Sequence, residues 1–228
     1  MLNADSVKEP NPTALALTVD EAVPVVSRRK IEIREAALTL MAERGYYGTS
    51  MEDIARLVDV RASSLYNHIR SKQSLLVDIM VTTMHELLAE FEGANGTGRP
   101  VDRIRRVMEA HVRYHALHQR DVRIGNREIP SLEEPDRSVV IRLRDTYERK
   151  WQTLIQDGID DGEFATPSAR LVAYALLEMG IGVSQWYREV GSLSLTEITQ
   201  HYGEMAVRLL GYEEAREAFT RTAKKSAR

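Results

Sequence analysis

The chain has 228 residues, of which 43% are hydrophobic, 29% are charged and none is cysteine. This composition is typical of a soluble globular protein, and the lack of cysteine excludes disulfide bridges and any metal or redox site built on thiolates. The formal net charge of −3 does not by itself indicate a nucleic-acid partner, and the N-terminus lacks the apolar segment of a secretory signal, so we expect a cytoplasmic protein.

The first helix is expected to follow an N-terminal tail. Residues 1–26 contain three prolines and an excess of acidic residues without a sustained hydrophobic period, which predicts a mobile tail. From about Ser27 to Gly45 the chain carries a hydrophobic stripe with helical spacing, formed by Ile33, Ala36, Ala37, Leu40 and Met41. The stripe predicts a helix that opens a small domain at residues 27–74.

Two short helices and a tight turn are predicted next, followed by a helix that begins at Lys72. Ser50 is placed to cap the first short helix, and Asp53 stands where the carboxylate of a capping box would lie. The chain is expected to turn at Asp59 and to enter the second short helix near Ala62. This pattern favours a helix-turn-helix.

The second short helix carries polar side chains on its outer face. Leu65 and Ile69, four residues apart, are expected to face the core. The remaining side chains bear the hydroxyl, amide, imidazole and guanidinium groups that contact base edges and phosphates in the major groove of DNA. They belong to Arg61, Ser63, Ser64, Tyr66, Asn67 and His68. The alternative interpretation is a polar helical hairpin on the surface.

The distribution of charge favours a nucleic-acid partner more than the net charge does. Residues 27–74 hold nine lysines and arginines against six acidic residues, whereas the rest of the chain holds 22 basic and 28 acidic residues. A basic domain on an acidic body is typical of a protein that binds a specific DNA site.

A longer ordered pattern runs through the same region. It consists of Gly45-Tyr46-Tyr47-Gly48-Thr49-Ser50-Met51, Ile54-Ala55, Val60, Ser64-Leu65-Tyr66-Asn67-His68 and Ser71-Lys72-Gln73-Ser74-Leu75-Leu76. The pattern resembles the N-terminal domain of TetR-family transcriptional regulators over about 50 residues, from Arg29 to Ile79. Asn67 stands where that family often has an aromatic residue, which bears on the base that is read, and Ile69 stands where Phe is common.

The resemblance implies an all-α homodimer, with the helix-turn-helix domain at residues 27–74 and a ligand-binding and dimerisation domain at 75–212. Its partner is then double-stranded operator DNA. The residues expected at base edges are Arg61, Ser63, Ser64 and Asn67, of which Asn67 has the amide needed to pair with adenine. The residues expected at phosphates are Ser50, Tyr66, His68 and Lys72.

The rest of the chain also predicts helices. A long helix is expected at residues 72–92, a Gly-rich linker at 93–100 and a basic tail at 213–228. Further hydrophobic periods predict helices near 100–118, 121–128, 136–161, 168–187 and 195–210. The fold class is therefore all-α.

The predicted helix at 168–187 is apolar on nearly all sides. Glu178 interrupts it and it is too short to span a membrane convincingly, so it is expected to be buried in protein. One face is expected to pack on its own core and the other on a second subunit. Together with the stripe on the helix at 195–210, it predicts a four-helix interface across a two-fold axis.

Three histidines share one face of the helix at 100–118, namely His111, His115 and His118. Their spacing permits two of them to share a metal ion, with a further ligand such as Glu128. They also suit the polar part of a cavity for an organic molecule, or structural histidines at the edge of solvent. We favour the organic cavity and expect no cofactor.

The residues expected to line this cavity are His111, His115, Met108, Tyr147, Trp151, Met179 and Trp186. Aromatic side chains, methionines and a few polar groups between helices suit a mostly apolar small molecule, although the same residues would also fill an ordinary core. No pair of a nucleophile and a base, no close carboxylate pair and no phosphate-binding loop is present in the sequence, so we do not expect an enzyme.

A second pattern concerns the effector. It consists of Trp186-Tyr187-Arg188, Gly191-Ser192-Leu193-Ser194, Tyr202 and Leu209-Leu210-Gly211. It is similar to the TetR-family repressors of lipid, fatty-acid and steroid catabolism, which implies an acyl-CoA effector. A basic residue at the mouth of the cavity, Arg123 or Arg127, would then meet the CoA phosphates.

The sequence therefore predicts a ligand-responsive DNA-binding regulator, most simply a repressor. Ligand binding is expected to change the angle of the helix at 72–92 and so the spacing of the two DNA-reading helices in the dimer. The alternative is a helical dimer that binds a metal ion or small molecule and whose main activity is not DNA binding.

Overall fold

The computed structural model describes residues 28–212, so the tails predicted at 1–26 and 213–228 lie outside the described residues. The expected all-α fold is confirmed, because every regular element of the described range is helical. The elements are α1 (Arg28–Arg44), α2 (Met51–Leu57), α3 (Ala62–Leu65), α4 (Lys72–Asn95), α5 (Pro100–Leu117), α6 (Gln119–Arg127), the short 3-10 helix η1 (Ile129–Ser131), α7 (Asp136–Asp160), α8 (Ala169–Trp186) and α9 (Leu195–Leu209).

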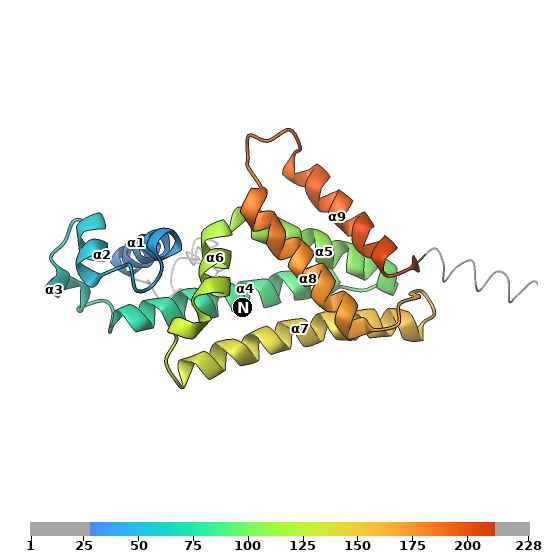
Figure 1. The fold of residues 1–228 in the computed structure, drawn as a ribbon, viewed down its shortest axis with the longest axis horizontal. Helices are drawn as coiled ribbons and strands as arrows, with labels where there is room; N and C mark the ends of the chain where they lie inside the picture. Colours follow the sequence, from blue (N-terminus) through green and yellow to red (C-terminus); the bar gives the residue numbers. More distant parts are fainter. Residues whose placement is uncertain (1–27, 213–228) are drawn as a thin grey trace, which may run out of the picture.

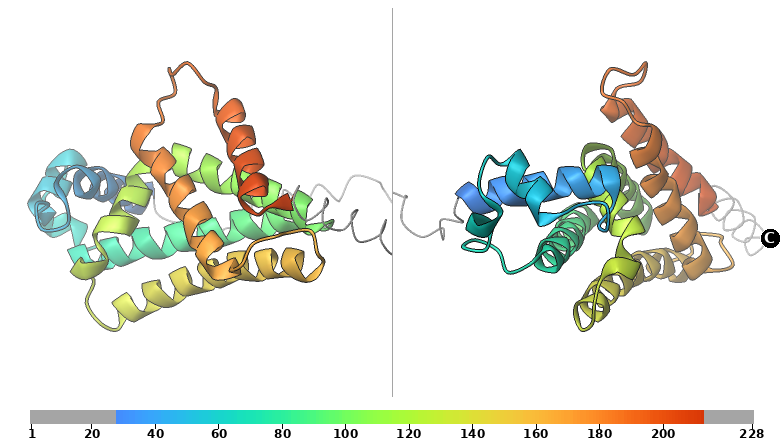
Figure 2. Two further views of the ribbon diagram at one scale, coloured as in Figure 1. Left: turned by 45° about the vertical axis from the view of Figure 1, so that its right-hand side comes forward. Right: turned by 60° about the vertical axis from the view of Figure 1, so that its left-hand side comes forward.

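The helices form a small group and a large group that share one long helix. Figure 1 shows α1, α2 and α3 together at one end, with α4 running from them along the molecule into the group formed by α5 to α9. The two further views in Figure 2 show the same division. In the described range no helix combines the length and the apolar character needed to cross a membrane.

The start of α2 is fixed by the capping box that the sequence predicts. The Ser50 hydroxyl accepts a hydrogen bond from the Asp53 amide at 3.0 Å, and the Asp53 carboxylate accepts from the Ser50 amide at 3.1 Å and from its hydroxyl at 2.7 Å. These bonds satisfy two of the amides that every helix start leaves without a partner. They also hold the pKa of the Asp53 carboxyl below its usual value.

The helix α4 belongs to both hydrophobic cores. Its first half packs under α1 to α3 through Leu75, Leu76, Ile79 and Met80, and its second half packs under α5 and α7 through Met84, Leu87 and Phe91. The expected boundary between residues 74 and 75 therefore lies inside the first turn of a continuous helix. A rotation of α4 necessarily moves side chains in both groups.

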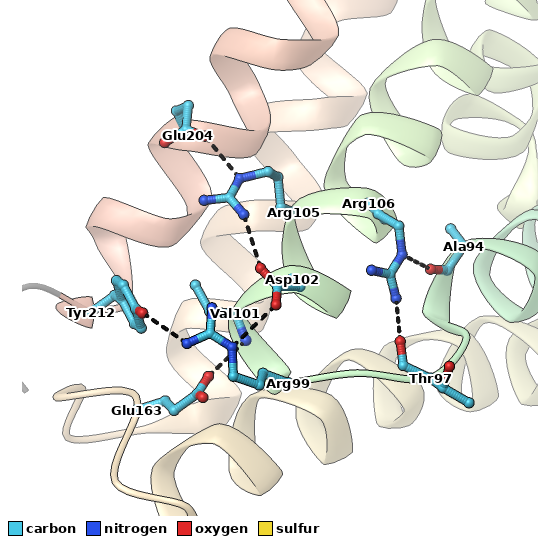
Figure 3. A network of polar contacts seen from close by, with 10 residues as sticks. All are labelled: Ala94, Thr97, Arg99, Val101, Asp102, Arg105, Arg106, Glu163, Glu204 and Tyr212. Atoms are coloured by element: carbon cyan, nitrogen blue, oxygen red, sulfur yellow. Dashed lines mark hydrogen bonds and ion pairs between the residues drawn. The ribbon is translucent and has the colours of Figure 1, made fainter. Parts of the chain in front are cut away.

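The linker between α4 and α5 is shorter than the Gly-rich pattern indicates, because α4 continues to Asn95. Arg106 of α5 extends across the end of α4 and donates hydrogen bonds to the carbonyls of Ala94, Asn95 and Thr97 at 3.0 to 3.3 Å. A guanidinium at the last carbonyls of a helix satisfies groups that would otherwise lack partners. Figure 3 shows the Arg106 side chain extending from α5 to Ala94 and Thr97.

A polar network fastens the start of α5 to the far end of the large group (Figure 3). Glu163, between α7 and α8, accepts a hydrogen bond from the amide of Val101 at 3.0 Å. Arg105 forms ion pairs with Asp102 at 3.4 Å and with Glu204 of α9 at 2.8 Å. The network therefore holds α5 and α9 together at the end of the molecule opposite α1 to α3.

Candidate functional site

The outer face of the α2–α3 unit carries side chains with no partner inside the described part of the protein. Asp59, at the turn, adopts a left-handed conformation with φ of 53°, which aspartate tolerates better than most residues. Ser64 is half-buried. None of the side chains predicted on the outer face of the second short helix forms a hydrogen bond with another described residue. Leu65 and Ile69 are buried, as expected. The exposed residues among those predicted to contact DNA from this face are Arg61, Ser63, Tyr66, Asn67 and His68.

Two of the residues predicted at phosphates have internal roles. The hydroxyl and amide of Ser50 are used by the capping box. The Lys72 ammonium donates to the carbonyls of Tyr46 at 2.9 Å and Thr49 at 2.7 Å and lies 4.3 Å from the centre of the Tyr46 ring. Lys72 therefore holds the loop between α1 and α2 against the start of α4, with one of its three ammonium donors left for another contact.

The helix α6 rests on α1 through arginine side chains. Arg120 donates to the Thr39 hydroxyl at 2.7 Å, and Arg123 lies 3.5 Å from the Ala42 carbonyl. Arg127 lies beside Gly45, where an added Cβ would be 3.0 Å from its guanidinium. Arg123 and Arg127, expected at a CoA site, thus face the small group of helices and do not line the cavity described next.

A cavity of about 400 Å³ lies inside the large group of helices. Its walls come from α4, α5, α6, α7 and α8 and are mostly apolar, with Met84, Leu87, Val122, Leu177 and Ile181 among the lining residues. A larger hollow of about 910 Å³ lies between α1 and the junction of α5 with α6, but charged side chains line it and Arg34, Glu35, Arg120 and Asp121 pair there. The smaller cavity is therefore the better candidate for an apolar ligand.

Three of the predicted ligand residues line this cavity: His111, His115 and Tyr147. Met108 and Trp151 are completely buried in the core, and Met179 is half-buried but does not belong to the lining. Trp186 is 48% exposed. It follows Ile181 by five residues, so it points roughly 140° away from the cavity side of α8.

The cavity is also lined by six polar residues that the sequence did not predict, namely Thr83, Asn126, Arg144, Glu148, Tyr174 and Glu178. Arg144 lies three residues before Tyr147 and four before Glu148, so helical spacing alone places it beside both of them on α7. Arg144 also donates to the Gly125 carbonyl of α6 at 3.2 Å. Arg144 is the arginine among the residues that line the cavity.

The hydrogen bonds of His111 determine which ring nitrogen carries its proton. Nε2 lies 3.1 Å from the Leu177 carbonyl, which only accepts, so Nε2 donates. Nδ1 then accepts from the Tyr147 hydroxyl at 2.9 Å. Burial and the neighbouring His115 ring hold the pKa of His111 well below its usual value, so the ring is neutral at pH 7.

His115 is neutral as well but is held by a different contact. Its Nδ1 lies 2.7 Å from the His111 carbonyl and therefore donates. Burial lowers the pKa of His115 to about 4. The unprotonated Nε2 has no hydrogen-bond partner among the described residues, and the ring lines the cavity, so this nitrogen offers a lone pair to an occupant.

The third histidine of the predicted stripe leaves the face. α5 ends at Leu117, and His118 has non-helical dihedral angles, stacks on the Tyr114 ring at 4.2 Å and lines the larger hollow. Glu128 is buried and accepts a hydrogen bond from Ser131 at 2.7 Å. Within residues 28–212 no three histidine, aspartate or glutamate side chains are grouped to hold a metal ion.

Comparisons with known proteins match both groups of helices. Residues 33–79 match the model of bacterial regulatory proteins of the tetR family, and residues 97–210 match the tetracyclin repressor-like C-terminal domain. The HTH-type transcriptional repressor KstR2 of Mycobacterium tuberculosis is 27% identical over 187 residues, which cover 81% of this chain and 94% of that protein.

Solved structures share the fold. The TetR-family regulator PfmR of Thermus thermophilus is 30% identical with a TM-score of 0.71, over 77% of this chain and 97% of that one. AibR, solved with isovaleryl coenzyme A and operator DNA, is 24% identical with a TM-score of 0.71, over 78% of this chain and 97% of its own. The matched families and relatives are regulators rather than enzymes.

Proposed function

The chain belongs to the TetR family of transcriptional regulators, and from that membership we propose a repressor whose operator binding is released when a small molecule enters the cavity beneath α8. The observation that carries the proposal is the path of α4. Its first turns support the DNA-reading unit, while Thr83, Met84 and Leu87 form part of the cavity wall. One rigid helix therefore joins the two sites. Such a repressor acts on chromosomal DNA, so we propose that it works in the cytoplasm.

A second connection runs through α6. Val122 and Gly125 line the cavity, whereas Arg120 and Arg123 of the same helix donate to α1. A ligand that fits only an expanded cavity displaces α4 and α6 together. The ligand then increases the population of the helix arrangement to which it binds more tightly. The spacing of the two α2–α3 units in the dimer changes as that population grows.

The repressor is proposed to act as a homodimer. The helices α8 and α9 expose large apolar side chains, namely Leu171, Tyr174, Met205 and Leu209. A two-fold axis beside these helices would pack the four helices of two subunits together. The two α2–α3 units could then reach successive major grooves of an operator with inverted half-sites.

The effector is proposed to be an acyl-CoA thioester or a related apolar molecule. KstR2 is described as a ketosteroid transcriptional regulator, and AibR was solved with isovaleryl coenzyme A. In this chain the cavity has apolar walls and a cationic side chain, Arg144, among its lining residues. The arginine suits an anionic group of the ligand, and the apolar walls suit its hydrocarbon part.

Selection of bound sequences from a random pool of duplex DNA tests this function. We expect the purified protein to enrich an inverted repeat whose halves are about one helical turn apart. Equal affinity for every duplex would instead support a helical dimer that binds a small molecule and does not recognise an operator.

Substitution of Asn67 tests the reading face. Asn67 is exposed and its side-chain amide makes no hydrogen bond within the described residues, so Asn67→Ala leaves the fold intact. We expect the variant to lose preference at one base position of each half-site, at a cost of about 1–3 kcal/mol on the selected operator. Competition binding against operators changed at single positions measures the effect. A uniform loss on all sequences would assign Asn67 to the phosphate backbone.

A further inference from the structure

We propose that the effector carries a hydroxyl group at its buried end, which donates a hydrogen bond to Nε2 of His115. The proposal rests on the proposed function in one respect, because it takes the cavity as the effector site. It adds the chemical class of the buried group, an alcohol rather than a ketone or a carboxylate. This class follows from where the protons of the polar cavity wall are held.

Four polar side chains of the inner wall are more than nine-tenths buried: Thr83, His111, His115 and Tyr147. Each of them gives its proton to an acceptor inside the protein. The Thr83 hydroxyl donates to the Ile79 carbonyl at 2.9 Å, and Nδ1 of His115 donates to the His111 carbonyl at 2.7 Å. Both ring nitrogens of His111 are used in internal hydrogen bonds. Thr83, His115 and Tyr147 each keep a lone pair, and none of the four has a remaining proton for a ligand.

The Tyr147 proton is held by a relay that cannot reverse. Tyr147 donates to Nδ1 of His111, and Nε2 of His111 donates to the Leu177 carbonyl. A reversed relay would require the carbonyl to donate, which it cannot do. The Thr83 and His115 protons also face backbone carbonyls, so none of the four protons can turn toward an occupant without breaking a buried hydrogen bond.

The inner wall therefore presents acceptors only. A ketone oxygen or a carboxylate at this depth meets lone pairs and loses its hydrogen bonds to water without replacement. A hydroxyl donates its proton to His115 and keeps its other contacts. An ammonium group would also donate, but neutral histidines give it no opposite charge, and burying an unpaired charge is costly.

The charged lining residues indicate which end of a ligand is buried. Arg144, Glu148 and Glu178 are all part of the lining, and none of them is a buried residue. An anionic group therefore lies toward Arg144, and the uncharged end lies toward the two histidines. An apolar molecule with a hydroxyl at that end satisfies both parts of the cavity.

Borneol and camphor test the inference, because they are compact apolar molecules with one carbon skeleton that differ as alcohol and ketone. Both fit a cavity of about 400 Å³. We expect calorimetry to show borneol binding about tenfold more tightly than camphor, the difference of one hydrogen bond. Camphor binding as tightly as borneol, or neither probe binding at millimolar concentration, would overturn the proposal.

Two variants locate the effect. His115→Leu removes the acceptor, and we expect the ratio of the two affinities to fall to about one. His118→Leu alters a histidine outside the cavity and should keep the wild-type ratio. The ratio is taken within each variant, so a general loss of stability affects both probes alike. A tenfold preference that persists in His115→Leu contradicts the assigned acceptor.

The same preparations are assayed for operator binding without a probe. A protein that binds its operator but shows no preference for the alcohol refutes the hydroxyl proposal alone. A protein that prefers the alcohol but binds no DNA refutes the proposed repressor and leaves the chemistry of the cavity in place.

Discussion

Replacement of Met205 and Leu209 by aspartate is expected to convert the dimer into a monomer and to lower operator affinity at least a hundredfold. Both side chains lie on α9, four residues apart, and are 42% and 46% exposed in the single chain. In the proposed dimer they are covered by the partner, where an unpaired carboxylate is costly. A monomer has only one α2–α3 unit, so it loses the avidity of two linked units, a factor of roughly 10²–10⁴ in affinity.

Light scattering at micromolar concentration and operator titration measure the two effects. Leu117→Asp is the matched control, because Leu117 is also a large exposed apolar residue, at 59%, but lies at the end of α5. It should leave both the mass and the affinity unchanged. A doubly substituted protein that remains dimeric would place the interface on other helices.

Local patterns in the sequence predicted the local features of the structure correctly. The capping box at Ser50 and Asp53 depends on residues three apart, and the burial of Leu65 and Ile69 depends on helical spacing alone. The all-α class and the family follow from such signals. They succeed because the groups that decide them lie within one turn of the same helix.

The features that the sequence did not predict depend on contacts between distant segments. α4 is longer than expected because Arg106 caps it from the next helix, and Lys72 is turned inward by two carbonyls of the preceding loop. His118 leaves the predicted stripe because α5 stops one residue earlier. Periodicity contains no information on any of these partners.

The candidate cavity also combines features set by local spacing with features set by contacts between distant segments. The spacing of His111 and His115 placed both rings on one face correctly, but the depth of each predicted ligand residue depends on how the helices pack. Trp151 proved to be core and Trp186 surface, although both are tryptophans on helices that line the cavity. Helical spacing places Arg144 beside Tyr147 on α7, but its contact with α6 at the cavity depends on how the two helices pack.

Gly180→Ala is expected to destabilise the protein and to disturb the His111 relay, although alanine favours helices. A Cβ at Gly180 would lie 2.0 Å from Cδ2 of His111 and 2.4 Å from its Nε2, the atom that donates to Leu177. The ring cannot withdraw, because His115 and Trp151 pack against it with ring centres at 4.1 and 5.3 Å. Either α8 shifts outward or His111 loses its carbonyl partner.

Overpacking costs about 1–3 kcal/mol, and a Cβ as close as 2.0 Å to a held ring belongs to the upper part of that range. The cost therefore exceeds the gain of about 1 kcal/mol from replacing a helical glycine. Gly93→Ala is the matched control, since Gly93 is also helical and its added Cβ would meet nothing within 4 Å. Denaturant unfolding at one fixed protein concentration should show a gain for Gly93→Ala and a loss for Gly180→Ala. Equal stability of the two variants would show that the His111 ring moves freely. Its proton relay would then not be fixed, and the acceptor-only character of the cavity would be lost with it.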